Sequence, residues 1–406
     1  MGIARGSLLA LLMALTALAP LAAQPWRGRA HGVVLGPDGE PLAGARVTLR
    51  PEAVAAAVGV AAPVAGTTGN DGRWALVLAA PGVWTIEVEA DGCHPAEGFV
   101  RVPAEGAAEA VEVALRSLAE VPPVSEAELR APEPPERPVL APEAHRRGRY
   151  RTAFAERSSL SDPAVVVPRY GGTEEDLSRL APDARYQLAE ETFEVYVPEG
   201  YAPAGAAAAP EYGLLVWVSP TRAGGVERPE LRPLLDERRL LWVGANSAGN
   251  PRSSLVRAGL ALDAAQAMAG LYDLDPERIY VAGYSGGGRM ASQLAMLFPE
   301  VFRGALALFG ASFFRPVPVP DRPGHHWPAA FPEPPAETLR RIRRETRLVL
   351  VTGERDFNRA QTRAVERALA ADGFERVTYV EVPGASHYQP FDDQERLREA
   401  LAALDL

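Results

Sequence analysis

The sequence contains no lysine, and Cys93 is its only cysteine among 406 residues. All 42 basic residues are therefore arginines, a bias typical of GC-rich genomes. A single cysteine excludes any intrachain disulfide, so packed cores must provide the stability. The chain also has no excess of basic over acidic residues. The net charge of -10 gives no electrostatic reason to expect a nucleic-acid partner.

Long hydrophobic runs are scarce as well. The most apolar stretch, Leu8–Leu18, follows Arg5 and precedes the small residues of Leu21-Ala22-Ala23. Such a run is too short to span a membrane comfortably, and its flanks are typical of a secretory signal. We therefore predict a signal peptide over residues 1–23 and a secreted or periplasmic mature protein with no membrane association. An uncleaved membrane anchor is the alternative.

The remaining sequence has the composition of a globular protein and room for two or three domains. Hydrophobic residues make up 47% and charged residues 23% of the chain. Prolines recur between Glu120 and Pro142, which predicts an extended, semi-rigid linker over residues 117–149. We expect a β-rich module at residues 27–116 and a larger domain at residues 150–406.

Short strand patterns separated by turns dominate the first module. Pro37-Asp38-Gly39 and Asn70-Asp71-Gly72 have turn chemistry, and Ala45–Leu49 alternates in the manner of a strand. Val83–Ala90 repeats this alternation, whereas the alanine-rich segment Ala53–Gly66 is expected to be a loop. This spacing predicts a small all-β sandwich.

The same residues carry a resemblance to a known family. The matching positions are Gly32, Asp38, Gly39, Pro41, Leu42, Gly44, Ala45, Val47 and the Asn70-Asp71-Gly72 turn. With them, the module resembles the carboxypeptidase-regulatory-like (transthyretin-like) domains. The resemblance implies a fold but no activity, because such modules serve as spacers, folding aids or binding surfaces.

From residue 150 onward, short apolar runs alternate with helical patterns. The predicted strands are Phe193–Val197, Leu214–Val218, Leu240–Ala245, Ile279–Ala282, Gly304–Phe309, Arg347–Thr352 and Arg376–Val382. Alternation of this kind predicts an α/β fold with a doubly wound, mostly parallel sheet. Ligands of such sheets bind beyond the carboxyl ends of the strands.

One turn in this domain has the pattern of a nucleophile. Gly283-Tyr284-Ser285-Gly286-Gly287 joins the strand Ile279–Ala282 to a helical segment, Arg289–Phe298. A G-x-S-x-G sequence between a strand and a helix is the context in which the serine is exposed for attack. The alternative is a glycine-rich turn that binds a dinucleotide, but the G-x-G-x-x-G spacing is missing. We therefore predict Ser285 as a catalytic nucleophile.

The partners that such a serine needs follow two later strands. Asp356 ends the loop after Arg347–Thr352, and His387 ends the loop after Arg376–Val382. The chain order of serine, acid and histidine is the one expected for an α/β-hydrolase. We predict catalytic roles for Asp356 and His387. Glu354 is the alternative acid, and a surface loop position is the alternative for His387.

An oxyanion hole requires two backbone N–H groups. Gly286 follows the nucleophile and provides one by the geometry of the turn. The loop after Leu214–Val218 begins Ser219-Pro220-Thr221, and Pro220 has no N–H to donate. Thr221 is therefore the predicted second donor, with Ser219 as the next candidate. The alternative is that this loop is only a turn.

Further residues are candidates for substrate contact. These are Asn246, Tyr284 and Trp327, with turn geometry or loop packing as the competing explanation for Asn246 and Trp327. His325 and His326 are adjacent, but no third ligand follows at regular spacing. We therefore predict no metal and no other cofactor.

The elbow region also carries a second resemblance. Leu274–Ala291 and Phe298–Ala305 are similar to the polyhydroxybutyrate depolymerase and feruloyl esterase group of α/β-hydrolases. The resemblance implies a carboxylic-ester hydrolase with a Ser-His-Asp triad. Its substrate would be a small-molecule or polymeric ester, namely a polyester, a feruloyl ester or an acetyl ester. The chain departs from this group at Ser219-Pro220, where relatives usually have His-Gly. The alternatives are a peptidase of the same fold and an inactive binding or adhesion protein.

Overall fold

The structure is a computed structural model, and it describes a large part of the chain. The described residues are 28–51, 62–78, 82–94, 96–102, 108, 110–117, 139–140, 143–178, 180, 185–204, 211–226, 231–320, 324, 326–387 and 391–405. The predicted signal peptide and most of the predicted linker lie outside these residues. None of the described helices combines the length and hydrophobicity that crossing a membrane requires.

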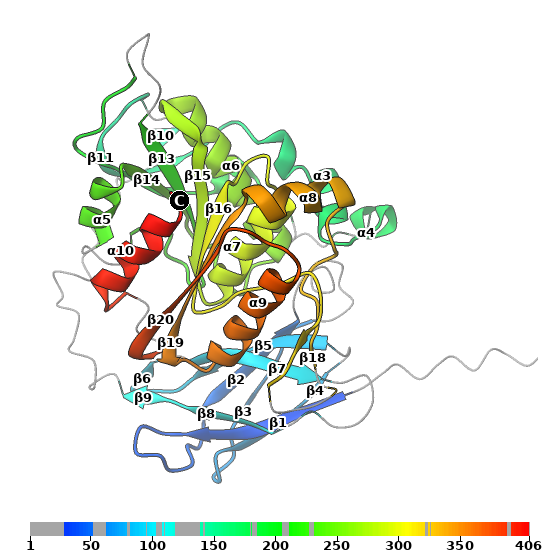
Figure 1. Cartoon of the computed structure of the whole chain (residues 1–406). Helices are drawn as coiled ribbons and strands as arrows, with labels where there is room; N and C mark the ends of the chain where they lie inside the picture. Colours follow the sequence, from blue (N-terminus) through cyan, green and yellow to red (C-terminus); the bar gives the residue numbers. More distant parts are fainter. Residues whose placement is uncertain are drawn as a thin grey trace, which may run out of the picture.

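The N-terminal domain is the predicted β-sandwich (Figure 1). One sheet has the strand order β4-β1-β8 and the other the order β3-β2-β5-β7. Its strands are β1 (Gly28–Leu35), β2 (Arg46–Pro51), β3 (Val64–Thr67), β4 (Arg73–Leu78), β5 (Gly82–Glu89), β6 (Cys93–His94), β7 (Ala96–Val102), β8 (Val111–Ala114) and β9 (Arg116–Ser117). Trp74 and Trp84 are buried between the two sheets with aliphatic side chains around them.

One expectation for this domain is wrong. The segment Ala53–Gly66 was expected to be a loop, but Val64–Gly66 belong to β3. This strand pairs antiparallel with β2, where Gly66 lies opposite Val47. Its residues alternate between partly buried and exposed, the period-2 pattern of an edge strand. The pairing covers one edge of β2, a long-range effect that the alanine-rich composition did not indicate.

The C-terminal domain is built on a single large sheet of order β10-β11-β12-β14-β13-β15-β16-β19-β20. Strands β11, β12 and β14 pair antiparallel, and the pairs from β14 to β20 are parallel. The strands are β10 (Val139–Leu140), β11 (Gly148–Ala153), β12 (Phe193–Val197), β13 (Tyr212–Val218), β14 (Leu240–Ala245), β15 (Leu274–Tyr284), β16 (Gly304–Leu308), β19 (Arg347–Arg355) and β20 (Val377–Ser386). The predicted fold class, an α/β-hydrolase sheet after a small sandwich, is confirmed. The sheet starts earlier than residue 150, because β10 and the first residues of β11 belong to it.

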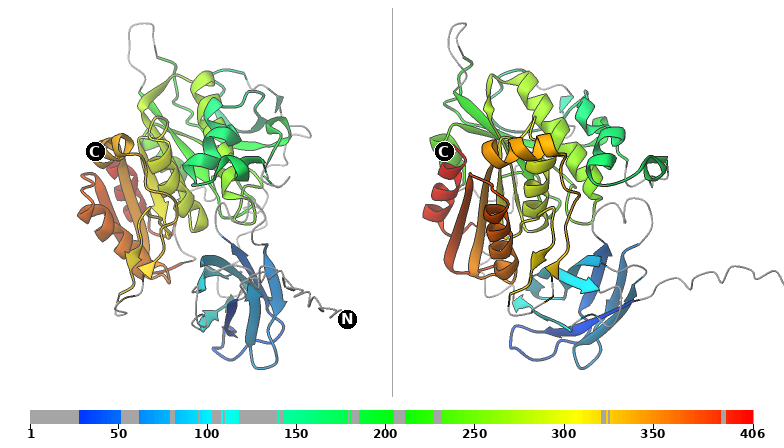
Figure 2. Two further views of the ribbon diagram at one scale, coloured as in Figure 1. Left: turned by 90° about the vertical axis from the view of Figure 1, so that its right-hand side faces the viewer. Right: turned by 45° about the vertical axis from the view of Figure 1, so that its right-hand side comes forward.

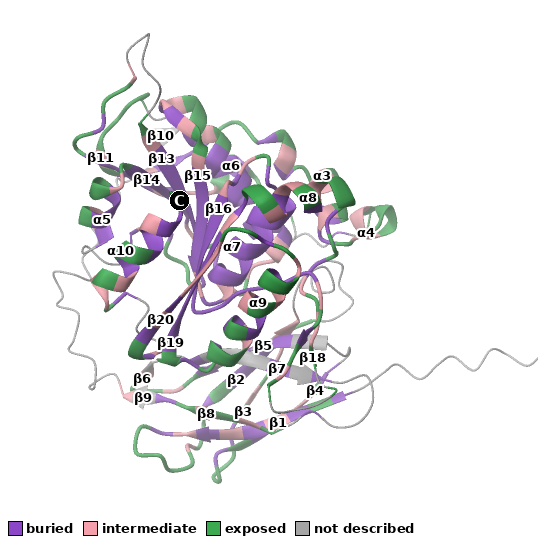
Figure 3. Ribbon diagram, in the orientation of Figure 1, coloured by how far each residue is buried: buried purple, intermediate pink, exposed green. Residues whose placement is uncertain are grey.

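Helices cover both faces of this sheet (Figure 2). One face packs against α3 (Pro163–Arg169), α6 (Ser254–Leu271), α7 (Gly286–Leu297), α8 (Ala336–Glu345) and α9 (Arg359–Ala371). The other packs against α5 (Leu231–Glu237) and α10 (Gln394–Ala403). Alternate residues of a strand enter the two cores, as Val216 and Trp217 of β13 do. Burial on both faces explains why the central strands are continuous apolar runs, and Figure 3 shows this buried centre.

Because β13, β15, β16, β19 and β20 are parallel, their carboxyl ends meet at one edge of the sheet. In Figures 1 and 2 the sandwich lies on the side to which the arrowheads of β19 and β20 point. The loops at this edge therefore lie between the two domains. They contain every catalytic residue predicted from the sequence.

Candidate active site

Ser285 occupies the sharp turn between β15 and α7. Its backbone has φ 55° and ψ -120°, in the left-handed region that a residue with a side chain rarely adopts. The N–H of Ser285 donates to the carbonyl of Leu308 at 2.8 Å, which anchors the turn to the neighbouring strand. Strained backbone of this kind occurs at many functional sites, including the turn expected here between strand and helix.

Two glycines make the turn sterically possible. A Cβ on Gly287 would lie 1.8 Å from the carbonyl oxygen of Val218, and one on Gly283 would lie 2.3 Å from the carbonyl carbon of Gly287. No side chain fits at these separations. The G-x-S-x-G spacing thus follows from backbone packing between β13, β15 and α7.

The structure brings Ser285, His387 and Asp356 together from three separate loops. His387 Nε2 lies 3.0 Å from Ser285 Oγ, and His387 Nδ1 lies 2.8 Å from Asp356 Oδ1. All three residues are buried, with at most 5% of the surface of each exposed. A carboxylate on one imidazole nitrogen and a hydroxyl on the other is the arrangement that removes a proton from serine.

Asp356 is fixed by further hydrogen bonds. The hydroxyl of Thr352 donates to Asp356 Oδ2 at 2.6 Å, and the N–H of Asn358 donates to Asp356 Oδ1 at 3.0 Å. Glu354, the alternative acid, instead accepts a hydrogen bond from the N–H of Gly384 at 2.8 Å. Asp356 is therefore the carboxylate that faces His387, while Glu354 connects the two loops.

Aromatic rings surround the imidazole of His387. The hydroxyl of Tyr284 donates to the carbonyl of His387 at 2.6 Å, so this predicted substrate contact holds the histidine loop in place. Phe309 lies at a ring-centroid distance of 6.2 Å and Phe357 at 4.0 Å. Phe357 was missed from the sequence, where its only signal is a large apolar residue directly after the acid.

The predicted oxyanion donors have different surroundings. Gly286 is the first residue of α7, so its N–H lies at a helix N-terminus, where negative charge is favoured. The N–H of Thr221 donates to Ser219 Oγ at 3.1 Å, within its own loop. The carboxamide of Asn250 lies directly beside Gly286, where a Cβ would be 2.1 Å from Asn250 Oδ1. The sequence predicts the segment Asn246–Asn250 at this edge of the sheet, and the structure places Asn250, not Asn246, beside Gly286.

Asn246 and Trp327 have structural contacts. Asn246 Oδ1 accepts from the N–H of Gly224 at 3.0 Å, and its Nδ2 donates to the hydroxyl of Thr192 at 3.1 Å. The side chain therefore connects the loops after β13 and β14. Trp327 lies in the two-stranded pair of β17 (Val317–Pro318) and β18 (His326–Trp327), packed against the main core.

Nothing in the described part of the chain gathers three or more histidine, cysteine, aspartate or glutamate side chains that could hold a metal ion. His326 is exposed on β18, and His325 lies outside the described residues.

Comparison with known proteins identifies the first domain. Residues 30–116 match the family model of the carboxypeptidase regulatory-like domain, in agreement with the resemblance and the sandwich. A search of curated proteins finds no match.

The solved structures with some likeness to the chain include three hydrolases. The S-formylglutathione hydrolase of Staphylococcus aureus is 14% identical with a TM-score of 0.40, covering 64% of this chain and 98% of that one. A thermostable carboxylesterase from a metagenomic library is 19% identical with a TM-score of 0.39, covering 53% and 83%. A ferulic acid esterase of Anaeromyces mucronatus is 15% identical with a TM-score of 0.38, covering 54% and 84%. At these TM-scores the likeness adds nothing to what the strand order already defines.

Proposed function

We propose that this protein is a serine hydrolase that cleaves carboxylic esters through an acyl-enzyme on Ser285. The observation that supports the proposal most directly is the continuous set of contacts from Asp356 through His387 to Ser285. It is supported by the strained turn that presents the serine at the carboxyl edge of the sheet.

In the proposed acylation step, Asp356 holds the proton of His387 on Nδ1, so that Nε2 is free to accept one. Ser285 Oγ transfers its proton to Nε2 and forms a bond to the carbonyl carbon of the ester. The tetrahedral intermediate collapses when His387 returns this proton to the leaving alcohol. Water then attacks the acyl-enzyme by the same route, and the free acid departs.

The intermediate carries a negative oxygen that two donors must stabilise. We assign one to the N–H of Gly286. Two groups qualify for the second. The N–H of Thr221 would exchange its bond with Ser219 Oγ for one to the oxyanion. Alternatively, Asn250 Nδ2 would donate from beside Gly286.

The substrate class follows from the resemblance of Leu274–Ala291 to polyhydroxybutyrate depolymerases and feruloyl esterases. Polyester, feruloyl and acetyl esters are the proposed substrates. The proposal includes export directed by residues 1–23 and a carboxypeptidase regulatory-like domain at residues 27–116, joined by a linker to a catalytic domain whose sheet begins with β10.

Labelling with a fluorophosphonate probe and turnover of p-nitrophenyl acetate test the proposal. The wild-type chain should take up one label and hydrolyse the ester, and Ser285→Ala should abolish labelling and lower kcat by at least about 10³-fold. Ser178→Ala, which removes an exposed hydroxyl on α4 (Glu174–Ser178), is the matched control. Labelling of the Ser285→Ala chain would contradict the proposal. A wild-type chain that resists the probe would favour the inactive binding protein, and faster cleavage of peptide amides than of esters would favour the peptidase.

A further inference from the structure

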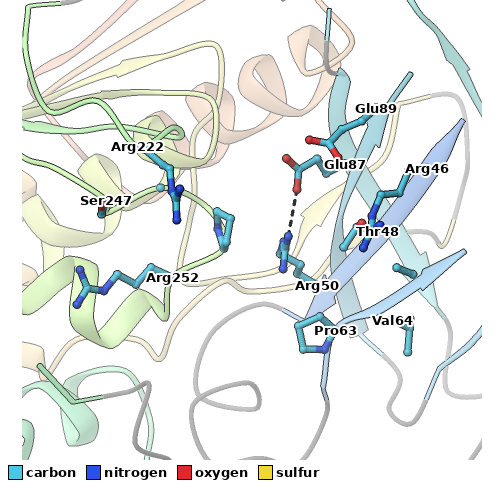
Figure 4. Close-up of a pocket in the computed structure, with 13 residues that line it drawn as sticks. Arg46, Thr48, Arg50, Pro63, Val64, Glu87, Glu89, Arg222, Ser247 and Arg252 are labelled. Atoms are coloured by element: carbon cyan, nitrogen blue, oxygen red, sulfur yellow. Dashed lines mark hydrogen bonds and ion pairs between the residues drawn. The ribbon is translucent and has the colours of Figure 1, made fainter. Parts of the chain in front are cut away.

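A cleft of about 690 Å³ lies between the sandwich and the catalytic domain (Figure 4). One wall is formed by β2, β3 and β5 of the sandwich, and includes Arg46, Arg50 and Glu87. The other is formed by two loops of the catalytic domain, and includes Arg222 and Arg252. The volume is within the range of about 300–1,000 Å³ that small-molecule sites occupy.

The catalytic wall of this cleft is continuous with the proposed oxyanion region. Arg222 directly follows Thr221, in the loop after β13. The cleft residue Gly249 packs so closely on this loop that a Cβ would lie 2.5 Å from the carbonyl oxygen of Thr221. The next residue, Asn250, contacts Gly286. The cleft and the proposed oxyanion region therefore share the loops after β13 and β14.

The two arginines on the catalytic wall differ in whether they form ion pairs. Arg252 forms a double hydrogen-bonded ion pair with Glu191, so its charge is largely balanced. Arg222 is exposed, and its side chain forms no hydrogen bond or ion pair with any residue that the structure describes. Figure 4 shows both guanidinium groups on this wall.

The sandwich wall provides two more guanidinium groups. Arg50 pairs with Glu87 at 3.3 Å. Arg46 is exposed and lies opposite Glu89 in the register of β2 and β5, but within the described residues it forms no ion pair closer than 4.0 Å. Four arginines and two glutamates thus line the cleft, an excess of positive charge in a chain whose net charge is -10.

We propose that the substrate reaches from Ser285 into the cleft, where Arg222 binds a carboxylate that the substrate carries and Arg46 on the sandwich wall adds positive charge. A guanidinium group binds a carboxylate through two parallel hydrogen bonds. Glu87 and Glu89 on the same wall disfavour a doubly charged phosphate group more than a singly charged carboxylate. The assignment rests on the proposed esterase function and gives the sandwich a role in substrate selection.

Two pairs of esters test this assignment on the full chain, each with one neutral and one carboxylated member. Methyl butyrate and monomethyl glutarate differ in the acyl part, and butyl acetate and 4-acetoxybutyrate differ in the alcohol part. In at least one pair, the wild-type kcat/KM should be about tenfold higher for the carboxylated ester, the size of one charge-assisted contact. This preference should decrease in 0.5 M NaCl, because salt screens exposed charges.

The variants Arg222→Gln and Arg46→Gln should each lower the ratio of carboxylated to neutral kcat/KM at least threefold, mainly through KM. Arg340→Gln removes an exposed arginine on α8 that does not line the cleft, and is expected to leave the ratio unchanged. Both cleft arginines are exposed, so their replacement should not affect folding.

Turnover of the neutral esters without preference in either pair overturns the carboxylate site and leaves the esterase function standing. A preference that persists in Arg222→Gln and Arg46→Gln overturns it as well. Failure to hydrolyse any of the four esters would instead count against the proposed function. In that case calorimetry with monomethyl glutarate and 4-acetoxybutyrate on the Ser285→Ala chain decides. Binding that is lost when Arg222→Gln is added supports the site, and no binding, or binding that persists, overturns it.

Discussion

The ring of Phe357 lies 4.0 Å from the imidazole of His387, centroid to centroid, at an interplanar angle of 31°. Phe357 is nevertheless 49% exposed, an unusual position for a large apolar side chain. Phe357 follows Asp356 directly in the chain, so two consecutive side chains contact the same imidazole. Asp356 contacts one nitrogen, while the ring of Phe357 packs on a face of the imidazole.

Phe357→Ala should therefore lower kcat/KM for p-nitrophenyl acetate by about 2–10-fold, the kinetic equivalent of one aromatic contact. The free energy of unfolding should change by less than about 0.5 kcal/mol, because the side chain is half exposed. Steady-state kinetics and urea unfolding measure the two quantities. Val77→Ala, which truncates an exposed residue of the sandwich, should change neither. Equal activity of Phe357→Ala and wild type would show that the ring does not position His387.

Thr352→Val should slow the proposed reaction by removing the 2.6 Å hydrogen bond to Asp356. We expect kcat to decrease about tenfold with little change in KM, because an acid that is less well held orients His387 less well. Thr362→Val is the matched control, since the hydroxyl of this buried threonine has no hydrogen-bond partner among the described residues. It should retain full activity. A Thr352→Val enzyme with unchanged kcat would contradict the positioning role.

Gly287→Ala should prevent the elbow from forming, because its Cβ would lie 1.8 Å from the carbonyl oxygen of Val218. Overpacking of this severity costs about 3 kcal/mol or more, so we expect a large loss of stability in urea unfolding together with loss of activity. Gly270→Ala makes the same substitution on α6, where a Cβ meets nothing within 4 Å. That variant should gain about 0.4–1 kcal/mol. Comparable stability of the two variants would mean that the backbones at the elbow can separate without cost.

Asn250→Ala distinguishes the two candidates for the second oxyanion donor. If Asn250 Nδ2 stabilises the intermediate, kcat should decrease about 10²-fold with KM nearly constant, as is typical for one donor of an oxyanion hole. Asn70→Ala, in an exposed turn of the sandwich, controls for the loss of a carboxamide. An unchanged kcat would assign the second donor to the N–H of Thr221. In that case Ser219→Ala, which removes the acceptor that holds this N–H, should alter kcat.

Local patterns in the sequence predicted the elements that can be recognised from the residues within them. The strands Phe193–Val197 and Leu240–Ala245 were predicted with the bounds that the structure has. Each is a short run rich in apolar or β-branched residues, so the residues within the segment are sufficient to predict it. The elbow was predictable for a related reason, since the whole G-x-S-x-G pattern lies within a few residues between one strand and the next helix.

Pairings between distant segments were not predictable in this way. Strand β10 lies within the expected linker, because two residues are too few to show any alternation. The choice between Glu354 and Asp356 depends on the pairing of β19 with β20, which shifts register between Gly353 and Arg355. This irregularity turns one carboxylate toward His387 and the other toward Gly384. Asn246 and Asn250 are alike in sequence, and only the packing of their loop shows which one contacts Gly286.

The sequence by itself determined the two-domain order, the parallel sheet and the identity of a serine, a histidine and an acid at strand ends. These follow from periodicity and turn chemistry, which act over a few residues. Only the tertiary structure decided that the three side chains lie within hydrogen-bonding distance, that Phe357 covers the histidine and that arginines from both domains line one cleft. Such contacts join residues up to hundreds of positions apart, and they depend on how strands pair and domains pack, which local patterns do not encode.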